Sequence, residues 1–261
     1  MKIAILGAGA YGQALAKILS DNQHQITFYD PAVYSDVSIE AATFETDAIV
    51  ITVPSMYLDS LIENYPENIK KIPTILASKG MTNIEKFSDF SQFSVISGPG
   101  FAQEIMDGKP TTLTASTPFA MGLFQNQQVT VELCEDTIGI VLCGAIKNIY
   151  AIGAGYYSNS ENMSATFLQH AHAEMQRYLV DHGAKAETAE LACGLGDLIL
   201  TCTNDTSRNY RCGVMLREGK SIDDITSELK TVEGLTTLLN ADVENYKLLR
   251  EIRDLVSSHS K

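Results

Sequence analysis

Short apolar runs alternate with amphipathic stretches along the N-terminal part of the chain. Runs this apolar, ended by Gly, Pro or Ser, are typical of strands buried on both faces, as in a parallel sheet covered by helices. The stretch Tyr11–Ser20 has the spacing of an amphipathic helix. The expected strands are Lys2–Leu6, Gln25–Tyr29, Ala48–Val53, Thr74–Ser78 and Ser94–Ser97, with Thr111–Ala115 and Val129–Leu133 as further strands of the same sheet.

Beyond about residue 137 the pattern changes to long helical stretches. We expect helices over Ile138–Gly153, Asn162–His182, Arg208–Arg217 and Leu235–Leu255. The sequence therefore predicts an α/β fold, with a doubly wound sheet domain at residues 1–137 and an all-helical domain at residues 138–261. The segment from Ile138 to Gly155 is apolar enough to raise the question of a membrane span. Its four glycines and its central Lys147 favour a helix buried in protein.

Composition narrows the classes of partner. The formal net charge is −13, and no basic run offsets it, so nucleic acid and anionic membranes are not expected ligands. A small anionic molecule remains open, because a few focused cations can outweigh a diffuse negative field. Five scattered cysteines predict reduced, packed thiols. The first residues run straight into a glycine loop without the longer apolar stretch of a signal peptide, so a cytoplasmic protein is expected.

The segment Gly7–Gly12 fits the pattern G-x-G-x-x-G, and it follows an expected strand and opens an expected helix. In that context Gly7 permits a tight turn, Gly9 lets the backbone approach a pyrophosphate, and Gly12 allows close packing of helix on strand. The helix N-terminus would then direct its free N–H groups toward the phosphates. The pattern predicts a Rossmann-type dinucleotide site, and the alternative is a purely structural glycine turn.

Asp30 closes the second expected strand, at the offset from Gly7 where a ribose-binding carboxylate is expected. A carboxylate there accepts hydrogen bonds from ribose hydroxyls and repels a 2′-phosphate, and no arginine follows it to reverse that preference. The sequence therefore favours NAD over NADP. The alternative is an ordinary loop aspartate before Pro31.

Lys147 interrupts an otherwise apolar helix. A buried ammonium without a partner is costly, and burial lowers the pKa of a lysine into the range of a general acid or base. Gly144 and Ala151 lie on the same helical face and leave room for a ligand. The alternatives are a lysine that snorkels to the surface or one that is paired with a buried carboxylate.

Two later segments carry polar side chains suited to the same site. Gly194-Leu195-Gly196-Asp197 is a glycine turn that presents one carboxylate, able to orient a lysine ammonium. Ser207-Arg208-Asn209 has the form of a helix start, where a guanidinium and a capping hydroxyl suit a phosphate. Taken singly, each is equally consistent with an ordinary turn or helix cap.

With these segments in order, the chain resembles the NAD(P)-dependent glycerol-3-phosphate dehydrogenase family of bacterial type. The match extends over most of the length. It rests on Gly7–Gly12, Val53-Pro54-Ser55, Ser78-Lys79-Gly80, Ser97-Gly98-Pro99-Gly100-Phe101-Ala102, Gly108-Lys109-Pro110-Thr111, Gly144-Ala145-Ile146-Lys147-Asn148, Ala173-Glu174-Met175, Gly194-Leu195-Gly196-Asp197-Leu198, Thr201-Cys202-Thr203, Ser207-Arg208-Asn209 and Val232-Glu233-Gly234.

The resemblance implies an oxidoreductase that interconverts sn-glycerol 3-phosphate and dihydroxyacetone phosphate in glycerophospholipid synthesis, with Lys147 as proton acceptor or donor. It implies that Lys79 helps to keep Lys147 neutral and that Asp197 orients it. The implied substrate contacts are Lys79, Gly98, Gly100, Lys147, Asp197, Ser207, Arg208 and Asn209. The implied cofactor contacts are Gly7, Gly9, Ala10, Tyr11, Gly12, Asp30, Pro54, Lys79, Ala102, Arg208, Thr231 and Glu233. A homodimer is implied as well.

The chain departs from the family pattern in several places. It is shorter between Asp30 and Asp47, around Tyr156–Asn162 and beyond Leu255, and Tyr11 and Gly100 stand where tryptophan and serine are common. No metal is expected, and His170 with Glu174 is interpreted as a solvent-facing pair. The rival interpretations are a two-domain reductase of another hydroxy acid, such as ketopantoate reductase, and a non-catalytic NAD-binding protein.

Overall fold

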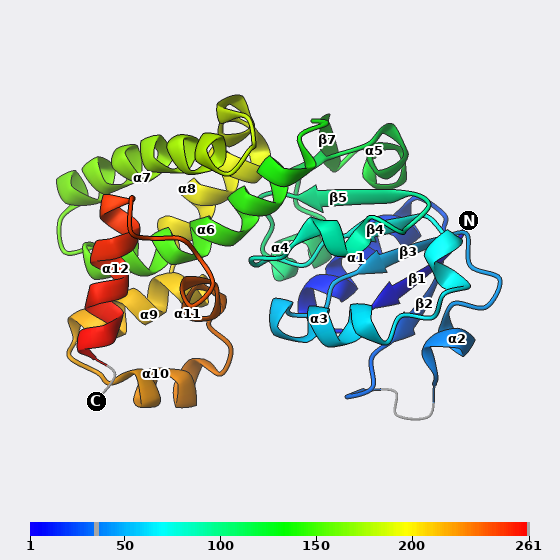
Figure 1. Ribbon diagram of the computed structural model, residues 1–261, viewed down its shortest axis with the longest axis horizontal. Coiled ribbons are helices and arrows are strands. Elements are labelled where there is room, and N and C mark those ends of the chain that lie inside the picture. Colours follow the sequence, from blue (N-terminus) through cyan, green and yellow to red (C-terminus); the bar gives the residue numbers. More distant parts are fainter. Residues whose placement is uncertain (34–36, 260–261) are drawn as a thin grey trace.

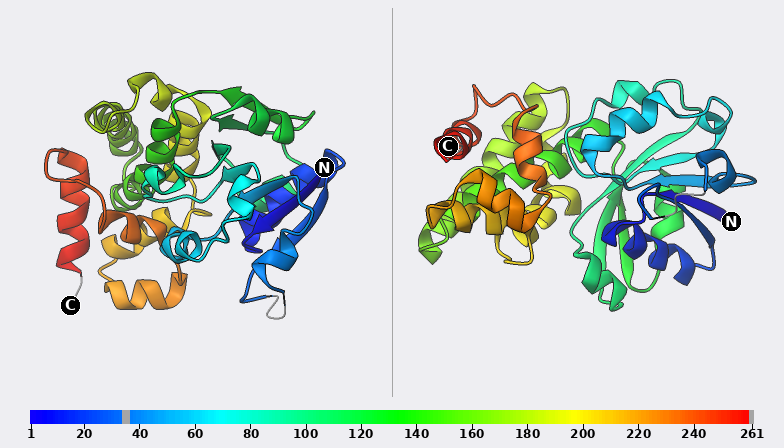
Figure 2. Two further views of the ribbon diagram at one scale, coloured as in Figure 1. Left: turned by 45° about the vertical axis from the view of Figure 1, so that its right-hand side comes forward. Right: turned by 90° about the horizontal axis from the view of Figure 1, so that it is seen from below.

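The computed structural model describes residues 1–33 and 37–259. Residues 34–36, within the shortened segment between Asp30 and Asp47, lie outside the described residues. A sheet domain and a helical domain lie side by side, as both views of Figure 2 show. The sheet is formed by β1 (Lys2–Leu6), β2 (Gln25–Tyr29), β3 (Ala48–Ile51), β4 (Thr74–Leu76), β5 (Phe93–Ser97), β6 (Thr111–Ala115) and β7 (Val129–Leu133).

The strands form one sheet in the order β2-β1-β3-β4-β5-β6-β7. Neighbouring strands are parallel except β5 and β6, which pair antiparallel. The prediction of an α/β doubly wound sheet is confirmed, and Thr111–Ala115 extends it as a strand antiparallel to β5. The connection from β5 to β6 holds one helix of five residues, Ala102–Met106, and it returns the chain antiparallel to β5.

Helices cover both faces of the sheet (Figure 1). On one face, α1 packs Leu15 and Leu19 against Ile3 and Ile5 of β1. On the other face, Leu58 of α3 joins a core that continues into the helical domain. The covering elements are α1 (Ala10–Asp21), α2 (Ile39–Ala42), α3 (Ser55–Glu63), α4 (Ala102–Met106), α5 (Pro118–Phe124) and the 3-10 turns η1 (Ile69–Lys71) and η2 (Ile84–Phe87).

A long apolar helix, α6 (Thr137–Tyr156), begins four residues after β7 and forms the centre of the helical domain (Figure 1). It is long and apolar enough to cross a membrane. However, 94% of its most apolar stretch is buried inside the protein, so it is a core helix. Around it lie α7 (Glu161–Asp181), η3 (Ala186–Glu190), a π-helical turn η4 (Ala192–Gly196), α8 (Asp197–Cys202), α9 (Arg208–Arg217), α10 (Ile222–Leu229), α11 (Glu233–Leu238) and α12 (Lys247–Ser258).

The expected continuous helix Leu235–Leu255 was wrong, because the segment is broken into α11 and α12. Glu174 of α7 caps the second of these helices: its carboxylate accepts hydrogen bonds from the backbone N–H groups of Leu248 and Leu249, at 3.0 Å each. Glu174 also accepts from the hydroxyl of Tyr150. Glu174 is therefore buried, and the interpretation of it as the solvent-facing partner of His170 was wrong.

Small residues bring α6 and α9 into backbone contact. A Cβ atom on Gly213 of α9 would overlap the carbonyl oxygen of Ile152, and one on Gly155 of α6 would overlap that of Tyr210. Close approach without side chains therefore fixes α9 against the C-terminal half of α6. The residues next to Lys147 and Arg208 face each other as a result.

Candidate active site

The carboxyl ends of four neighbouring parallel strands carry predicted site residues. The glycine loop follows β1, Pro54 follows β3, Lys79 follows β4 and Gly98 follows β5. The chain changes direction of winding between β1 and β3, and ligands of open α/β sheets bind at such a switch point, beyond the carboxyl ends. The helical domain borders the same edge, since α6 contacts β5.

The glycine loop has the geometry that a pyrophosphate site needs. Gly7 has φ of +112°, which disfavours any side chain, and a Cβ there would lie 2.7 Å from Thr52 Oγ1. A Cβ on Gly12 would overlap the carbonyl oxygen of Gly7, so only glycine lets α1 pack this close to β1. A Cβ on Gly9 would meet no atom within 4 Å, so the space above the N-terminus of α1 is open.

Asp30 lies beside this loop. Its Oδ2 accepts a hydrogen bond from the backbone N–H of Ala8 at 2.8 Å, and its Oδ1 accepts from that of Ala32 at 3.0 Å. The carboxylate therefore fixes the loop to the end of β2. Each oxygen keeps a lone pair that ribose hydroxyls can use.

The Lys147 amine points inward, toward Asp197. Its Nζ lies 2.8 Å from Asp197 Oδ2, and the two side chains are 3% and 2% exposed. Nζ also donates to Thr201 Oγ1 at 3.0 Å, and Thr201 donates to Asp197 Oδ1 at 3.3 Å. The closed set of contacts fixes the amine at one position. Thr201 had no role in the sequence analysis, although its spacing of four residues from Asp197 on α8 was a usable signal.

Lys79 shares the same carboxylate from the sheet side. Its Nζ lies 3.2 Å from Asp197 Oδ2 and donates to the carbonyl oxygen of Gly98 at 3.3 Å. It also lies 5.0 Å from the centroid of the Tyr11 ring, in a cation–π contact. The structure thus brings two ammonium groups from two domains onto one carboxylate.

The pKa values of the two lysines are shifted in opposite directions. Burial, with the nearby Lys79 charge, lowers the pKa of Lys147 to about 8, although Asp197 opposes the shift. Burial also acts on Lys79, but there the Asp197 carboxylate outweighs it and raises the pKa. For Asp197 burial is outweighed by the two lysines, which lower its pKa. Lys147 is therefore the group that can exchange a proton near neutral pH, while Lys79 stays charged.

A chain of amide contacts links the three helices around the site. Asn209 Nδ2 donates to Asn148 Oδ1 at 2.9 Å, and Asn209 Oδ1 accepts from the backbone N–H of Gly234 at 2.9 Å. Asn148 Nδ2 donates to Gly144 O and to Glu233 Oε2. Asn148 had no role in the sequence analysis. The position directly after Lys147 places it at this junction of α6, α9 and α11.

The predicted phosphate-binding residues lie at the start of α9. Ser207 caps the helix by accepting from the N–H of Tyr210, which leaves its own proton free to donate. Arg208 is exposed, and Asn209 is buried in the contacts above. Burial raises the pKa of Glu233, against the charges of Lys79, Lys147 and Arg208, which lower it.

The other predicted residues begin or precede helices at the same edge. Gly100 lies in the loop between β5 and α4, where a Cβ would meet Ile105 at 2.9 Å. Ala10 opens α1, Pro54 precedes α3, Ala102 opens α4, Thr231 precedes α11 and Glu233 opens it.

Comparison with known proteins decides the family. The N-terminal and C-terminal models of NAD-dependent glycerol-3-phosphate dehydrogenase match residues 2–32 with 29–121, and 136–252. The chain is 32% identical to the glycerol-3-phosphate dehydrogenase (NAD(P)+) of Shouchella clausii, over 90% of this chain and 84% of that protein. The chain belongs to the NAD-dependent glycerol-3-phosphate dehydrogenase family.

Solved structures agree. The crystal structure of glycerol-3-phosphate dehydrogenase from Coxiella burnetii is similar with a TM-score of 0.86 and 26% identity, over 98% of this chain and 94% of that one. The enzyme of Saccharomyces cerevisiae, at 19% identity and a TM-score of 0.80, shares the fold, over 98% of this chain and 95% of that one. The resemblance seen in the sequence is confirmed, and the chain is an enzyme of an NAD(P)-dependent family.

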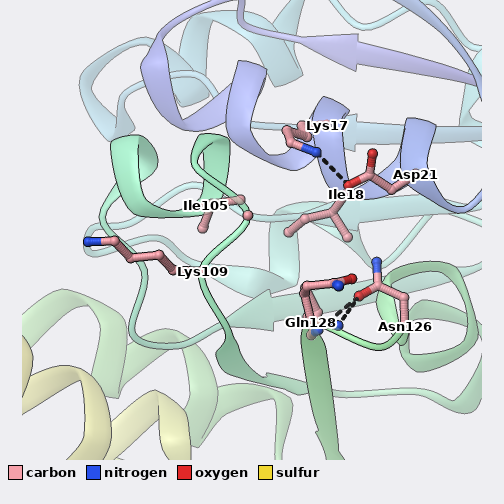
Figure 3. Close-up of a pocket in the computed structure, with 9 residues that line it drawn as sticks. Lys17, Ile18, Asp21, Ile105, Lys109, Asn126 and Gln128 are labelled. Atoms are coloured by element: carbon pink, nitrogen blue, oxygen red, sulfur yellow. Dashed lines mark hydrogen bonds and ion pairs between the residues drawn. The ribbon is translucent and has the colours of Figure 1, made fainter.

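A surface hollow lies away from this site, between α1, α4 and β7 (Figure 3). Its polar lining is already occupied: Lys17 is paired with Asp21, and Asn126 accepts from the backbone N–H groups of Gln128 and Val129. Among the described residues that line it, none belongs to the predicted site.

Proposed function

We propose that this chain interconverts sn-glycerol 3-phosphate and dihydroxyacetone phosphate with NAD or NADP. One observation carries the proposal. Between the glycine-loop domain and the helical domain lies a buried lysine with its pKa lowered to about 8, held by a carboxylate that also binds a second, charged lysine. Such an amine suits proton transfer to and from a secondary alcohol.

In this proposal Lys147 takes the proton from the C2 hydroxyl during oxidation and returns it to the ketone during reduction. At pH 7 about one amine in ten is already neutral for a pKa near 8. Asp197 and Thr201 hold the amine in place, so little reorganisation is needed when the substrate arrives. The charge of Lys79 stabilises negative charge that develops on the C2 oxygen.

The residues at the strand ends fit a dinucleotide. When bound, the nicotinamide accepts or returns the hydride of C2. The open N-terminus of α1 would hold the pyrophosphate, and Asp30 would hold the adenosine ribose, which favours NAD over NADP. The further cofactor contacts proposed are Ala10, Tyr11, Pro54, Lys79, Ala102, Arg208, Thr231 and Glu233.

The start of α9 would hold the substrate phosphate through Ser207, Arg208 and Asn209. Replacing Arg208 with alanine should raise the KM for glycerol 3-phosphate by about 10–100-fold, because a charge-assisted contact to an exposed anion is lost. The value of kcat should change far less. Steady-state kinetics at saturating NAD measures both, and an unchanged KM would remove Arg208 from the phosphate site.

The lowered pKa of Lys147 predicts a pH dependence of opposite sign in the two directions. Oxidation needs the neutral amine, so kcat/KM for glycerol 3-phosphate should rise with pH and level off above about 8. Reduction needs the ammonium, so kcat/KM for dihydroxyacetone phosphate should fall above the same pH. Profiles that are flat across this range, or that share one sign, would contradict the assignment.

A separate role is also proposed for each of the two domains. Residues 1–137 would bind the dinucleotide, and residues 138–261 would hold the substrate and the base. We further propose a cytoplasmic homodimer that feeds glycerophospholipid synthesis and binds neither nucleic acid nor membrane, in keeping with the net charge of −13.

The proposed function is tested by adding dihydroxyacetone phosphate to the purified protein with NADH or NADPH. Oxidation of the reduced cofactor should follow the ketone concentration and saturate. Dihydroxyacetone without its phosphate is the control and should support little turnover. A protein that oxidises neither cofactor with this ketone, or that prefers a hydroxy or keto acid such as ketopantoate, would overturn the proposal.

A further inference from the structure

The hydroxyl group of Tyr11 is buried and has no hydrogen-bond partner among the described residues. Buried hydroxyls nearly always have a partner, since an unmatched one loses the hydrogen bonds that it makes in water. Within residues 1–33 and 37–259, four side-chain hydroxyls share this state, those of Tyr11, Tyr65, Ser97 and Thr237. Tyr11 is of interest among these four because its ring lies under a buried cation, the Lys79 amine.

The position of the hydroxyl follows from its neighbours. Tyr11 is the second residue of α1, and its ring packs against the core on the side of α4. Burial raises the pKa of its phenol, and the charges of Lys79 and Asp197 both act on it. The ring therefore lies next to the Lys79 amine, which contacts the shared carboxylate, and the hydroxyl keeps its proton near neutral pH. It is a buried hydrogen-bond donor without a recipient among the described residues, on a ring that contacts a cation of the site.

The proposed substrate has one polar group that the site described so far does not use. Lys147 takes the oxygen at C2, and the start of α9 takes the phosphate at C3. The hydroxyl at C1 remains, and it must lie on the side of C2 away from the phosphate. Tyr11 and Lys79 come from the sheet domain, whereas Lys147 belongs to α6.

We propose that the Tyr11 hydroxyl donates a hydrogen bond to the C1 oxygen of the bound triose and so contributes to substrate specificity. This inference rests on the proposed function. It makes Tyr11 a substrate-binding residue as well as a neighbour of the cofactor. A phenylalanine at this position would keep the ring and its contact with Lys79 and lose only the donor.

The test is Tyr11→Phe. The variant's dissociation constant for glycerol 3-phosphate should rise about tenfold, because one buried hydrogen bond to the substrate is lost. Calorimetry on the NADH-saturated enzyme measures this constant. The KM for glycerol 3-phosphate should rise by the same factor. The dissociation constant for NADH should stay unchanged. The melting temperature should not fall, because the free protein loses no hydrogen bond. Tyr65→Phe removes a buried hydroxyl elsewhere in the same domain and should leave all substrate constants unchanged.

A substrate analogue identifies the recipient oxygen. Hydroxyacetone phosphate lacks only the C1 hydroxyl of dihydroxyacetone phosphate, so the wild-type protein should use it about tenfold less well in kcat/KM. Tyr11→Phe should treat the two ketones alike. The inference would be overturned if the wild type and Tyr11→Phe discriminated equally between the two ketones. It would also be overturned if Tyr11→Phe lost affinity for NADH alone, or if its melting temperature were lowered. Failure of the wild type to reduce dihydroxyacetone phosphate would instead overturn the proposed function, and this inference with it.

Discussion

Replacing Lys147 with alanine should abolish turnover in both directions and leave dinucleotide binding intact. The amine is the proposed proton carrier, and general acid–base catalysis by one group contributes about 10²–10⁴-fold. The fold should survive, because Asp197 keeps Lys79 as a partner at 3.2 Å and so does not become an unpaired buried charge. Stopped-flow or steady-state rates measure the first effect, and fluorescence titration with NADH measures the second.

Two further variants and one added amine test this prediction. Lys147→Arg keeps a positive charge that does not deprotonate, so it should be as inactive as the alanine variant. Added methylamine should partly restore the alanine variant, because a small amine fits the space that is left. Lys86→Ala, which removes an exposed lysine paired with Asp59, should behave as wild type. An alanine variant with wild-type kcat would end the assignment of Lys147.

Replacing Asp197 with asparagine should cost both stability and activity. The change removes the one carboxylate shared by two buried ammonium groups. Breaking such a pair destabilises proteins by about 3–5 kcal/mol. Activity should fall by about 10²-fold or more, because Lys147 loses the contact that fixes its orientation. Asp21→Asn breaks an exposed ion pair with Lys17 and should cost less than about 1 kcal/mol.

The loss of stability in the asparagine variant should shrink as the pH rises. Without the carboxylate, burial and Lys79 should lower the pKa of Lys147 further below its unfolded value. The unfolded chain then binds more protons than the native one, so the free energy of unfolding rises with pH up to the unfolded pKa of lysine, about 10.4. Denaturant titrations at pH 7 and pH 9 measure the difference. An equal loss of unfolding free energy, relative to the wild type, at both pH values would contradict this account.

Local patterns in the sequence were enough to predict most of the sheet and the central helix. Apolar runs located all seven strands within a few residues, and the glycine spacing of Gly7 and Gly12 identified a contact that the structure shows between α1 and β1. These features depend on neighbours in the chain. The start of α12 does not, because its first N–H groups are capped by Glu174, which lies more than seventy residues earlier.

The site could be predicted as a list of residues, but its connections could not. The sequence indicated a buried lysine, a carboxylate in a glycine turn and a cation after β4. That Lys79 and Lys147 would share one oxygen of Asp197 depends on how the two domains pack, which no local pattern encodes. The same holds for Thr201 and Asn148, which gain their positions from contacts across helices, and for the unpaired hydroxyl of Tyr11.

The central claim is that the buried amine of Lys147 supports transfer of the C2 hydrogen of glycerol 3-phosphate to the dinucleotide. Incubating the protein with NAD and sn-glycerol 3-phosphate deuterated at C2, followed by mass spectrometry of the reduced cofactor, tests it directly. Wild-type protein should yield reduced cofactor that carries one deuterium, and Lys147→Ala should yield none above background. Reduced cofactor without the label, or labelled cofactor formed equally fast by Lys147→Ala, would contradict the claim.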